Sequence, residues 1–254
     1  NYAPGKTPLM TALDMPFLPL PSPQVIAKVM EEAYTFQPLI DELKRWNGKA
    51  LVGVPLPPYE LMGVGKPPRT LQDYKGMRVR ALGGSGDAMR QLGAIPTSVA
   101  APEVYGALER GLFHAVAFPF SYGFGVYKLH ELSKWYTQGI ILGTVHNSMV
   151  VSEKAFNKLP AEYQKLLVDN KAGYYQALFD AYESEDKKWI PIYEQKGLEK
   201  IVITPAQLKE FQEKGAQPVW DAWVAEFEGK GLPARKTFEF IKESAERHAK
   251  GKGA

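Results

Sequence analysis

The sequence predicts an α/β fold, because short apolar segments of strand character alternate with helical segments along much of the chain. The strand candidates are residues 49–56, 76–82, 114–118 and 139–152, and the glycine-rich residues 83–93 follow the second of them as a strand–turn–helix. From about Pro160 the pattern becomes helical, with aromatic and leucine side chains at spacings of four and seven. Layered sheets joined to a long helix are therefore expected.

Residues that cap or break helices mark the expected boundaries. Ser22 is a candidate N-cap, and Pro23 follows it at the first helical position. The segment from Pro160 to Pro191 would span about 45 Å at 1.5 Å per residue, so we expect it to lie against two domains. Pro191 should kink or end this helix. Residues 235–251 predict an exposed, charged helix at the end of the chain.

Composition excludes several classes of protein. The 254 residues carry a net charge of +3 with scattered lysines, so nucleic acid is not an expected partner. No run approaches the roughly 20 apolar residues of a membrane span, so no direct membrane insertion is expected. The absence of cysteine excludes disulfides, thiolate metal sites and cysteine nucleophiles. No signal peptide is recognisable, so the chain is expected to be cytosolic, processed or a fragment.

No catalytic constellation emerges from the motifs. The four histidines are far apart and form no HExxH or histidine–carboxylate cluster, so no metal is expected. In the stretch GGSGD, Asp87 stands where a nucleophile elbow needs glycine, and no Gly-Lys-Ser/Thr follows to complete a phosphate loop. A strand-to-helix turn is the simpler interpretation, although the N–H groups of a helix start attract anions. We expect neither a cofactor nor an enzyme.

Arg80 ends a strand candidate directly before the glycine-rich turn. Its guanidinium would donate two parallel N–H bonds to a carboxylate, which gives orientation as well as affinity. Further along, residues 118–127 hold five aromatic side chains around Pro119 and two glycines, a run too broken for one regular strand or helix. Such a run is either dense core or the wall of a pocket. Together, the two features favour a carboxylate clamp beside an aromatic wall.

Three motifs follow one another between residues 71 and 119: Lys75-Gly76…Arg80, Gly93…Pro96, and Glu103-Val104-Tyr105…Ala107-Leu108…Gly111. Their order and spacing resemble those of DctP-type solute-binding proteins of tripartite ATP-independent periplasmic (TRAP) transporters. The stretch LDMPFL upstream, SEKAFNKLPAEYQK downstream and the long helix after it are also similar to the family. The resemblance covers essentially the whole chain.

This resemblance implies a two-lobed periplasmic binding protein that closes over an organic acid, with the long helix bracing both lobes. It also implies a periplasmic location and, as partners, the membrane subunits of a TRAP transporter. The carboxylate-binding arginine of the family falls on Arg80, not on Arg78. The family's first strand, first helix and second strand should precede Asn1, so we expect the N-terminal part of the first lobe to be missing from this chain.

Departures from the family pattern bear on the ligand. Phe118 stands where many members place a ligand-contacting asparagine, Tyr59 and Glu60 stand near a second polar or cationic position, and His114-Ala115 replaces the usual Asp-Gly. One arginine beside an apolar wall suits an aromatic monocarboxylate such as benzoate, hydroxybenzoate or phenylacetate. A small aliphatic 2-oxo or 2-hydroxy acid is the alternative ligand, and an enzyme acting on such an acid is the alternative from another class.

The expected ligand-binding residues are Arg80, Phe118, Tyr59, Asn147, Ala101, Phe17 and Met149. Three other aromatic residues of the broken run, Phe120, Phe124 and Tyr127, are expected in the core.

The chain should cross between lobes near Pro57 and near Ile140. Lobe I would then comprise residues 1–57 and 141–185, and lobe II residues 58–140 and 186–254. In this arrangement residues 145–152 return to lobe I and should not share a sheet with residues 77–82.

Overall fold

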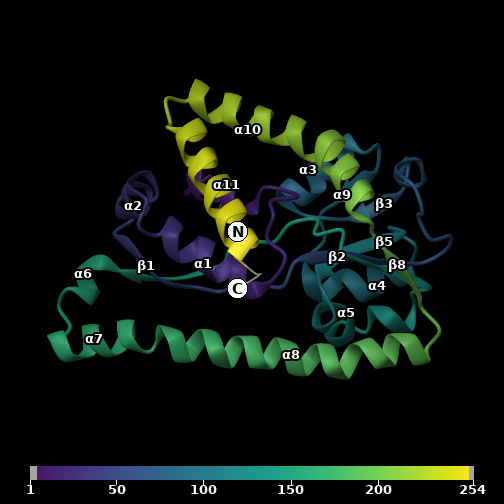
Figure 1. Ribbon diagram of the computed structural model, residues 1–254, viewed down its shortest axis with the longest axis horizontal. Coiled ribbons are helices and arrows are strands. Elements are labelled where there is room, and N and C mark those ends of the chain that lie inside the picture. Colours follow the sequence, from purple (N-terminus) through teal and green to yellow (C-terminus); the bar gives the residue numbers. More distant parts are fainter. Residues whose placement is uncertain (1–4, 252–254) are drawn as a thin grey trace.

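The computed structural model describes residues 5–251 and shows two sheets with a long helix running beneath both of them (Figure 1). The larger sheet has six strands in the order β4-β3-β5-β2-β6-β8. Its strands are β2 (Tyr59–Gly63), β3 (Arg78–Arg80), β4 (Ile95–Thr97), β5 (Ala115–Pro119), β6 (Trp135–Gln138) and β8 (Glu199–Val202). Strand β2 is antiparallel to β5 and β6, whereas β3 is parallel to β4 and β5, and β6 is parallel to β8.

Both faces of this sheet are covered, so β5 at its centre is apolar throughout. Along β5, Ala115 and Ala117 join one apolar cluster while Val116 and Phe118 join the other. Short helices surround the sheet: α3 (Gly83–Gln91), α4 (Val104–Glu109), α5 (Tyr122–Val126), α9 (Pro205–Phe211), the π-helix η5 (Gln212–Ala216) and the 3-10 helices η2 (Leu71–Tyr74), η3 (Ala101–Glu103) and η4 (Leu129–Glu131). The prediction of a layered α/β fold is confirmed.

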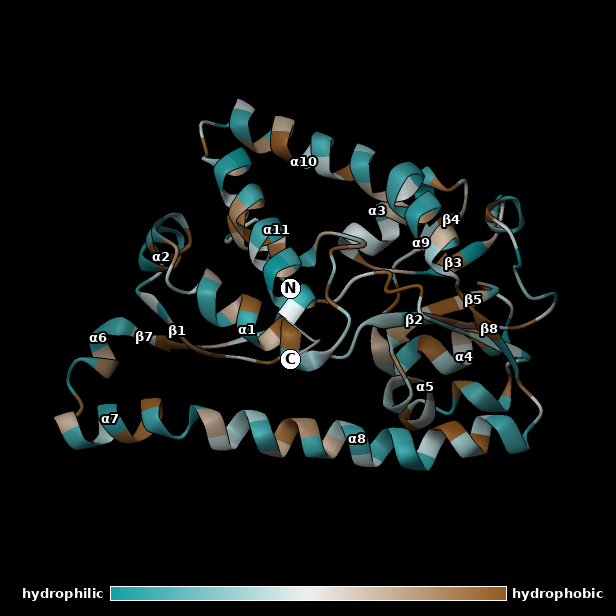
Figure 2. Ribbon diagram, in the orientation of Figure 1, coloured by the Kyte–Doolittle hydropathy of each residue, from teal (hydrophilic) through white to brown (hydrophobic). Residues whose placement is uncertain are grey.

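The smaller sheet consists of two antiparallel strands, β1 (Gly48–Gly53) and β7 (Ser148–Ser152). Both strands appear largely brown, hence hydrophobic, in Figure 2. The elements around it are the 3-10 helix η1 (Leu9–Asp14), α1 (Pro23–Ala33), α2 (Gln37–Lys44) and α6 (Glu153–Phe156). Helix α1 begins as its sequence predicts, because the Ser22 hydroxyl accepts a hydrogen bond from the N–H of Val25. Because β7 pairs with β1 alone, it lies in a different sheet from β3, as the sequence predicts for residues 145–152.

Two connecting segments, residues 54–58 and 139–147, join the sheets. They run side by side: the N–H of Val54 donates to the carbonyl of Asn147 at 2.8 Å, and the N–H of Tyr59 donates to that of Gly143 at 2.8 Å. These backbone hydrogen bonds join the two connecting segments to each other.

The long helix is formed by α7 (Ala161–Asp169) and α8 (Lys171–Gln195), which follow each other with a turn at Asn170. Of the two alternatives expected at Pro191, an end of the helix is wrong, because α8 continues to Gln195. The rings of Trp189 and Tyr193, which flank the proline in sequence, stack on each other. Helix α7 has no buried residue and leaves Leu166 56% exposed. Figure 2 shows brown and teal turns mixed along α7.

The C-terminal helices α10 (Gln217–Gly229) and α11 (Ala234–Lys250) fold back over the molecule, and α11 reaches α1 (Figure 1). The prediction that this last helix is simply exposed and charged is wrong, because Phe238, Ile241 and Ala245 bury one of its sides. On its polar side, Ser244 and His248 bond the carboxylate of Glu32 on α1. Among residues 5–251, no helix combines the length and the apolarity that crossing a bilayer requires.

Candidate ligand-binding cleft

Arg80 ends strand β3 with its side chain 3% exposed. Its Nε donates to the carbonyl of Val99 at 3.1 Å and one terminal nitrogen donates to the carbonyl of Ala117 at 3.0 Å. The guanidinium carbon lies 4.5 Å from the centre of the Phe118 ring. These contacts hold a buried guanidinium in one orientation against an aromatic face.

Arg78, two residues earlier, has a different environment. It is exposed, and its guanidinium donates to the carbonyls of Leu112 at 3.0 Å and Gly111 at 2.8 Å. The N–H of Arg78 contacts the Nδ1 of His114 at 3.3 Å, and burial lowers the pKa of that imidazole. The structure thus separates a surface arginine from a buried one on the same strand.

A cavity of about 870 Å³ opens beside Arg80. Of the residues predicted to bind ligand, Arg80, Phe118, Tyr59, Ala101 and Asn147 line it. Its other walls come from η1, the connecting segments, the start of α3 and helix α10. The structure brings these five residues together from three strands of the larger sheet, from η3 and from the second connecting segment.

Phe17 and Met149 do not line the cavity, and we no longer assign them to the site. Phe17 is 1% exposed and stacks on Phe211 at a ring distance of 5.8 Å, so it belongs to the core. Met149 lies on β7 and is 45% exposed.

The broken aromatic run divides between core and cavity. Phe118 is 6% exposed, lines the cavity and stacks on Tyr127 at 5.1 Å. Phe124 is fully buried, and Phe120 and Tyr127 pack against the same apolar cluster. After Pro119 the chain turns at Ser121, whose φ of 56° ends the strand and starts α5. Of this run, Phe118 lines the cavity beside Arg80, whereas Phe120 lines a second, separate cavity.

Several lining residues had no assigned role in the sequence. Leu82, Gly83 and Gly84 at the start of α3 belong to the glycine-rich turn. A Cβ on Gly84 would lie 2.6 Å from the carbonyl oxygen of Asp14, so only glycine allows η1 to approach α3 this closely. Trp223 and Phe227 of α10 add an apolar wall. The glycine pattern was the one available signal, and it indicated only a turn.

Asp14 is another lining residue that sequence reasoning missed. Its Oδ1 accepts a hydrogen bond from the N–H of His146, and burial raises the pKa of this carboxyl to about 6. Burial likewise lowers the pKa of His146 to about 4, and its Nε2 lies 3.1 Å from the hydroxyl of Tyr34. The cavity therefore contains a carboxylate at a fixed position as well as a guanidinium. Asp14 belongs to the stretch LDMPFL, which carried only the family resemblance.

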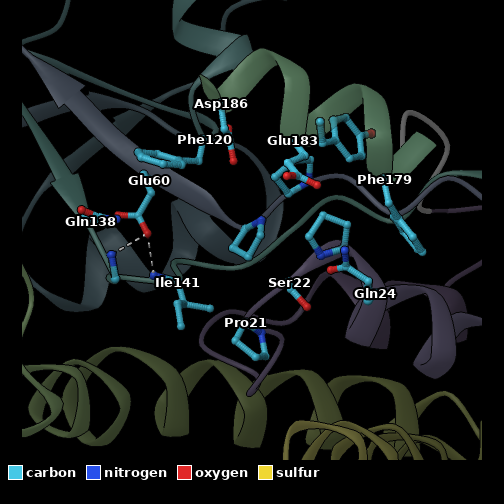
Figure 3. A pocket seen from close by; sticks show the side chains of 15 residues that line it. Pro21, Ser22, Gln24, Glu60, Phe120, Gln138, Ile141, Phe179, Glu183 and Asp186 are labelled. Carbon is cyan, nitrogen blue, oxygen red and sulfur yellow. Dashed lines mark hydrogen bonds between the residues drawn. The ribbon is translucent and has the colours of Figure 1, made fainter. Parts of the chain in front are cut away.

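A second cavity, of about 440 Å³, lies between the connecting segments, the start of α1 and helix α8 (Figure 3). On one side Glu60 of β2 accepts hydrogen bonds from the N–H groups of Gly139 at 2.9 Å, Ile140 at 3.3 Å and Ile141 at 3.4 Å. The hydroxyl of Thr137 donates to the same carboxylate at 2.7 Å. Burial outweighs these bonds and raises the pKa of Glu60 to about 7. Glu60 thus holds the second connecting segment to β2, and it does not line the cavity beside Arg80.

No group of three or more histidine, aspartate or glutamate side chains that could hold a metal ion occurs among residues 5–251. The cavity beside Arg80 offers a positive charge, an aromatic face and apolar walls, and two connecting segments join the two sheets next to it. These are the features of a site that encloses an organic anion.

The model of bacterial extracellular solute-binding proteins, family 7 (DctP), matches residues 1–226 of the chain. Among curated proteins, a solute-binding protein of Albidiferax ferrireducens is 26% identical over 170 residues, which make up 65% of this chain and 49% of that protein. The chain thus spans about half the length of this relative.

Solved structures are similar over nearly the whole chain. A TRAP solute-binding protein from Rhodoferax ferrireducens T118, in complex with copurified benzoate, has a TM-score of 0.84 and 20% identity over 99% of this chain and 78% of that one. A marine metagenome TRAP solute-binding protein of an unidentified microbe, specific for aromatic acid ligands and in complex with 3-hydroxybenzoate, has a TM-score of 0.81 and 21% identity over 97% and 77%. Others hold orotic acid, malonate or β-D-galacturonate.

At these identities the solved structures establish the two-lobed fold, and the family model establishes the relationship. The resemblance seen in the motifs around Arg80 is confirmed. The chain belongs to bacterial extracellular solute-binding protein family 7, the DctP family of TRAP solute-binding proteins.

Proposed function

We propose that this solute-binding protein captures an aromatic monocarboxylate in the periplasm and delivers it to the membrane subunits of a TRAP transporter. One observation carries the proposal: the buried guanidinium of Arg80 lies against the Phe118 ring within a single cavity. The ligand carboxylate would take hydrogen bonds from Arg80, and its ring would pack on Phe118. Tyr59 and the apolar wall of α10 would enclose the rest of the ligand.

The comparisons support an organic acid but leave its class open. Benzoate and 3-hydroxybenzoate occupy two of the similar structures, while orotic acid, malonate and galacturonate occupy others of the same fold. The choice therefore depends on the residues of this chain. A sugar acid needs polar partners for its hydroxyls, and Phe118 offers none.

The alternative ligand, a small aliphatic 2-oxo or 2-hydroxy acid, suits the cavity less well. The volume of the cavity, about 870 Å³, lies in the range of pockets that hold drug-sized ligands. A three-carbon acid would leave Phe118 and the α10 side chains facing unfilled space, so little of their apolar surface would be buried on binding.

Closure of the cleft is proposed to move two lobes about the connecting segments. We place the larger sheet in one lobe and the smaller sheet in the other, as the division near residues 57 and 140 predicted. The packing of α11 on α1 favours counting that helix with the smaller sheet, whereas the sequence-based division counted it with the larger one.

Calorimetric titration of the purified protein with benzoate and phenylacetate, against pyruvate and lactate, tests the ligand class. Arg80→Ala should weaken aromatic acid binding by about 10- to 100-fold, because a hydrogen bond to a charged group contributes roughly 1.5–3 kcal/mol. Arg80→Lys keeps the charge but loses the planar fork, so it should also weaken binding. Arg78→Ala is the matched control, since its guanidinium bonds surface carbonyls.

Two results would overturn the proposal. Tighter binding of pyruvate or lactate than of every aromatic acid would exclude the aromatic class. Unchanged affinity in Arg80→Ala would exclude the clamp. Mass spectrometry of the ligand after incubation checks that it is released unaltered, as expected of a binding protein and not of an enzyme.

A further inference from the structure

We propose that Asp14 selects aromatic monocarboxylates that carry a hydrogen-bond donor on the ring, such as hydroxybenzoates, and rejects those that carry a second carboxylate. This inference rests on the proposed function, because it assumes that the ligand carboxylate is held by Arg80. It adds a second polar contact that neither the family resemblance nor the motifs assign.

Asp14 and Arg80 enter the same cavity from separate elements. Arg80 comes from strand β3 of the larger sheet, whereas Asp14 is the last residue of η1, which packs on α2 and α11. The backbone of Asp14 abuts the start of α3, where a Cβ on Gly84 would lie 2.6 Å from its carbonyl oxygen. A ligand bound at Arg80 is therefore within the space that Asp14 also lines.

The carboxylate of Asp14 is held in place. Its Oδ1 accepts the backbone N–H of His146, and the ring of that histidine is fixed by the Tyr34 hydroxyl at 3.1 Å. Within the described chain, Asp14 forms no ion pair and its Oδ2 has no hydrogen-bond donor. A largely buried carboxylate with one backbone donor is costly to maintain. A ligand group that donates to the second oxygen would lower that cost.

The other acidic residues that line the cavity are already paired. Asp87 bonds Arg90 at 2.5 Å, and Glu226 bonds Lys230 at 2.5 Å. Asp14 is thus the carboxylate that remains to face the ligand. An ionised carboxylate only accepts hydrogen bonds, so it can bind a hydroxyl but must repel a second ligand carboxylate.

Calorimetry with benzoate, 3-hydroxybenzoate, 4-hydroxybenzoate, isophthalate and terephthalate tests the inference on the wild-type chain. At least one hydroxybenzoate should bind about tenfold more tightly than benzoate, and both dicarboxylates should bind at least tenfold more weakly. In Asp14→Asn the amide oxygen can still accept the N–H of His146, but the negative charge is gone. The ratio of dicarboxylate to benzoate affinity should therefore rise about tenfold in this variant.

Asp41→Asn is the matched control, because Asp41 is an exposed carboxylate on α2 that bonds Gln37. It should leave all affinity ratios unchanged. If benzoate binds but hydroxyl groups bring no gain and Asp14→Asn leaves the ratios unchanged, Asp14 merely positions His146 and the inference is wrong while the proposed function stands. If no aromatic acid binds the wild-type chain, both fail together. The wild-type ligand series decides the matter even should Asp14→Asn not fold.

Discussion

Glu60 holds the second connecting segment in place, and replacing this residue by glutamine should change how stability varies with pH. Its carboxylate accepts four hydrogen bonds, three of them from the backbone of the second connecting segment. Figure 3 shows it at the edge of the cavity that helix α8 closes from the other side. Glutamine has nearly the same shape but does not titrate. Its amide NH2 group is itself a donor and would face some of the donors that now bond the carboxylate.

The size of the effect follows from the pKa of Glu60, which burial raises from 4.5 to about 7. At about 1.4 kcal/mol for each pH unit, this difference amounts to about 3 kcal/mol. Because the folded-state pKa is the higher one, the native protein binds the proton more tightly than the unfolded chain. The contribution is complete below pH 4.5 and is lost as the pH rises through about 7.

Urea denaturation of both proteins between pH 4.5 and 8, followed by circular dichroism, measures the free energies of unfolding. The wild type minus Glu60→Gln difference should fall by about 3 kcal/mol across this range. Burial also raises the pKa of Asp14 and Asp186, but those groups are common to both proteins and cancel. Glu183→Gln is the control, because this exposed carboxylate lines the same cavity and Lys187 lowers its pKa. A difference that stays flat or rises with pH for Glu60→Gln would show that the four hydrogen bonds outweigh burial.

Two further substitutions test the contact between α5 and α8 and the contact between α2 and η1. In Gly125→Ala the new Cβ would lie 2.1 Å from the Trp189 ring, so the contact between α5 and α8 would be overpacked. The free energy of unfolding, measured by urea denaturation, should fall by about 1–3 kcal/mol. An unchanged free energy would mean that α8 can shift to make room at no cost. The carboxylate of Glu42 accepts the N–H groups of Leu9 at 2.7 Å and Met10 at 2.9 Å, and in Glu42→Gln one of these N–H groups should lose its acceptor. The free energy of unfolding should then fall by about 1–3 kcal/mol, and the hydrogen of that amide should exchange faster. Unchanged exchange at both amides would contradict this.

The sequence predicted those parts of the fold that depend on neighbouring residues. Ser22 and Pro23 start α1 because a cap acts within one turn, and the glycine-rich residues 83–93 form a turn and helix as expected. The family motifs selected Arg80 over Arg78, and Arg80 does line the cavity. Each of these signals is local or is carried by spacing along the chain.

Contacts between distant residues could not be predicted in the same way. Asp14 and His146 are 132 residues apart, and nothing near either one indicates the other. The same holds for Glu60, whose partners lie 77 or more residues away. The course of α11 is different, because Phe238, Ile241 and Ala245 do form a helical stripe that its many charges obscured. That error was one of interpretation, whereas the others reflect information absent from local pattern.

Glu60, which holds the second connecting segment, and Phe118, which lines the cavity beside Arg80, are neighbours in the larger sheet. This affects how binding data must be interpreted. Glu60 and Phe118 are direct partners across the antiparallel pair of β2 and β5. Directly opposite residues in such a pair lie close enough to influence each other's packing. A Phe118 substitution that lowers affinity therefore has two possible origins, a lost ring contact or a displaced Glu60. Only a variant whose unfolding free energy keeps the wild-type pH dependence separates them, because that dependence reports on Glu60 and not on the ligand.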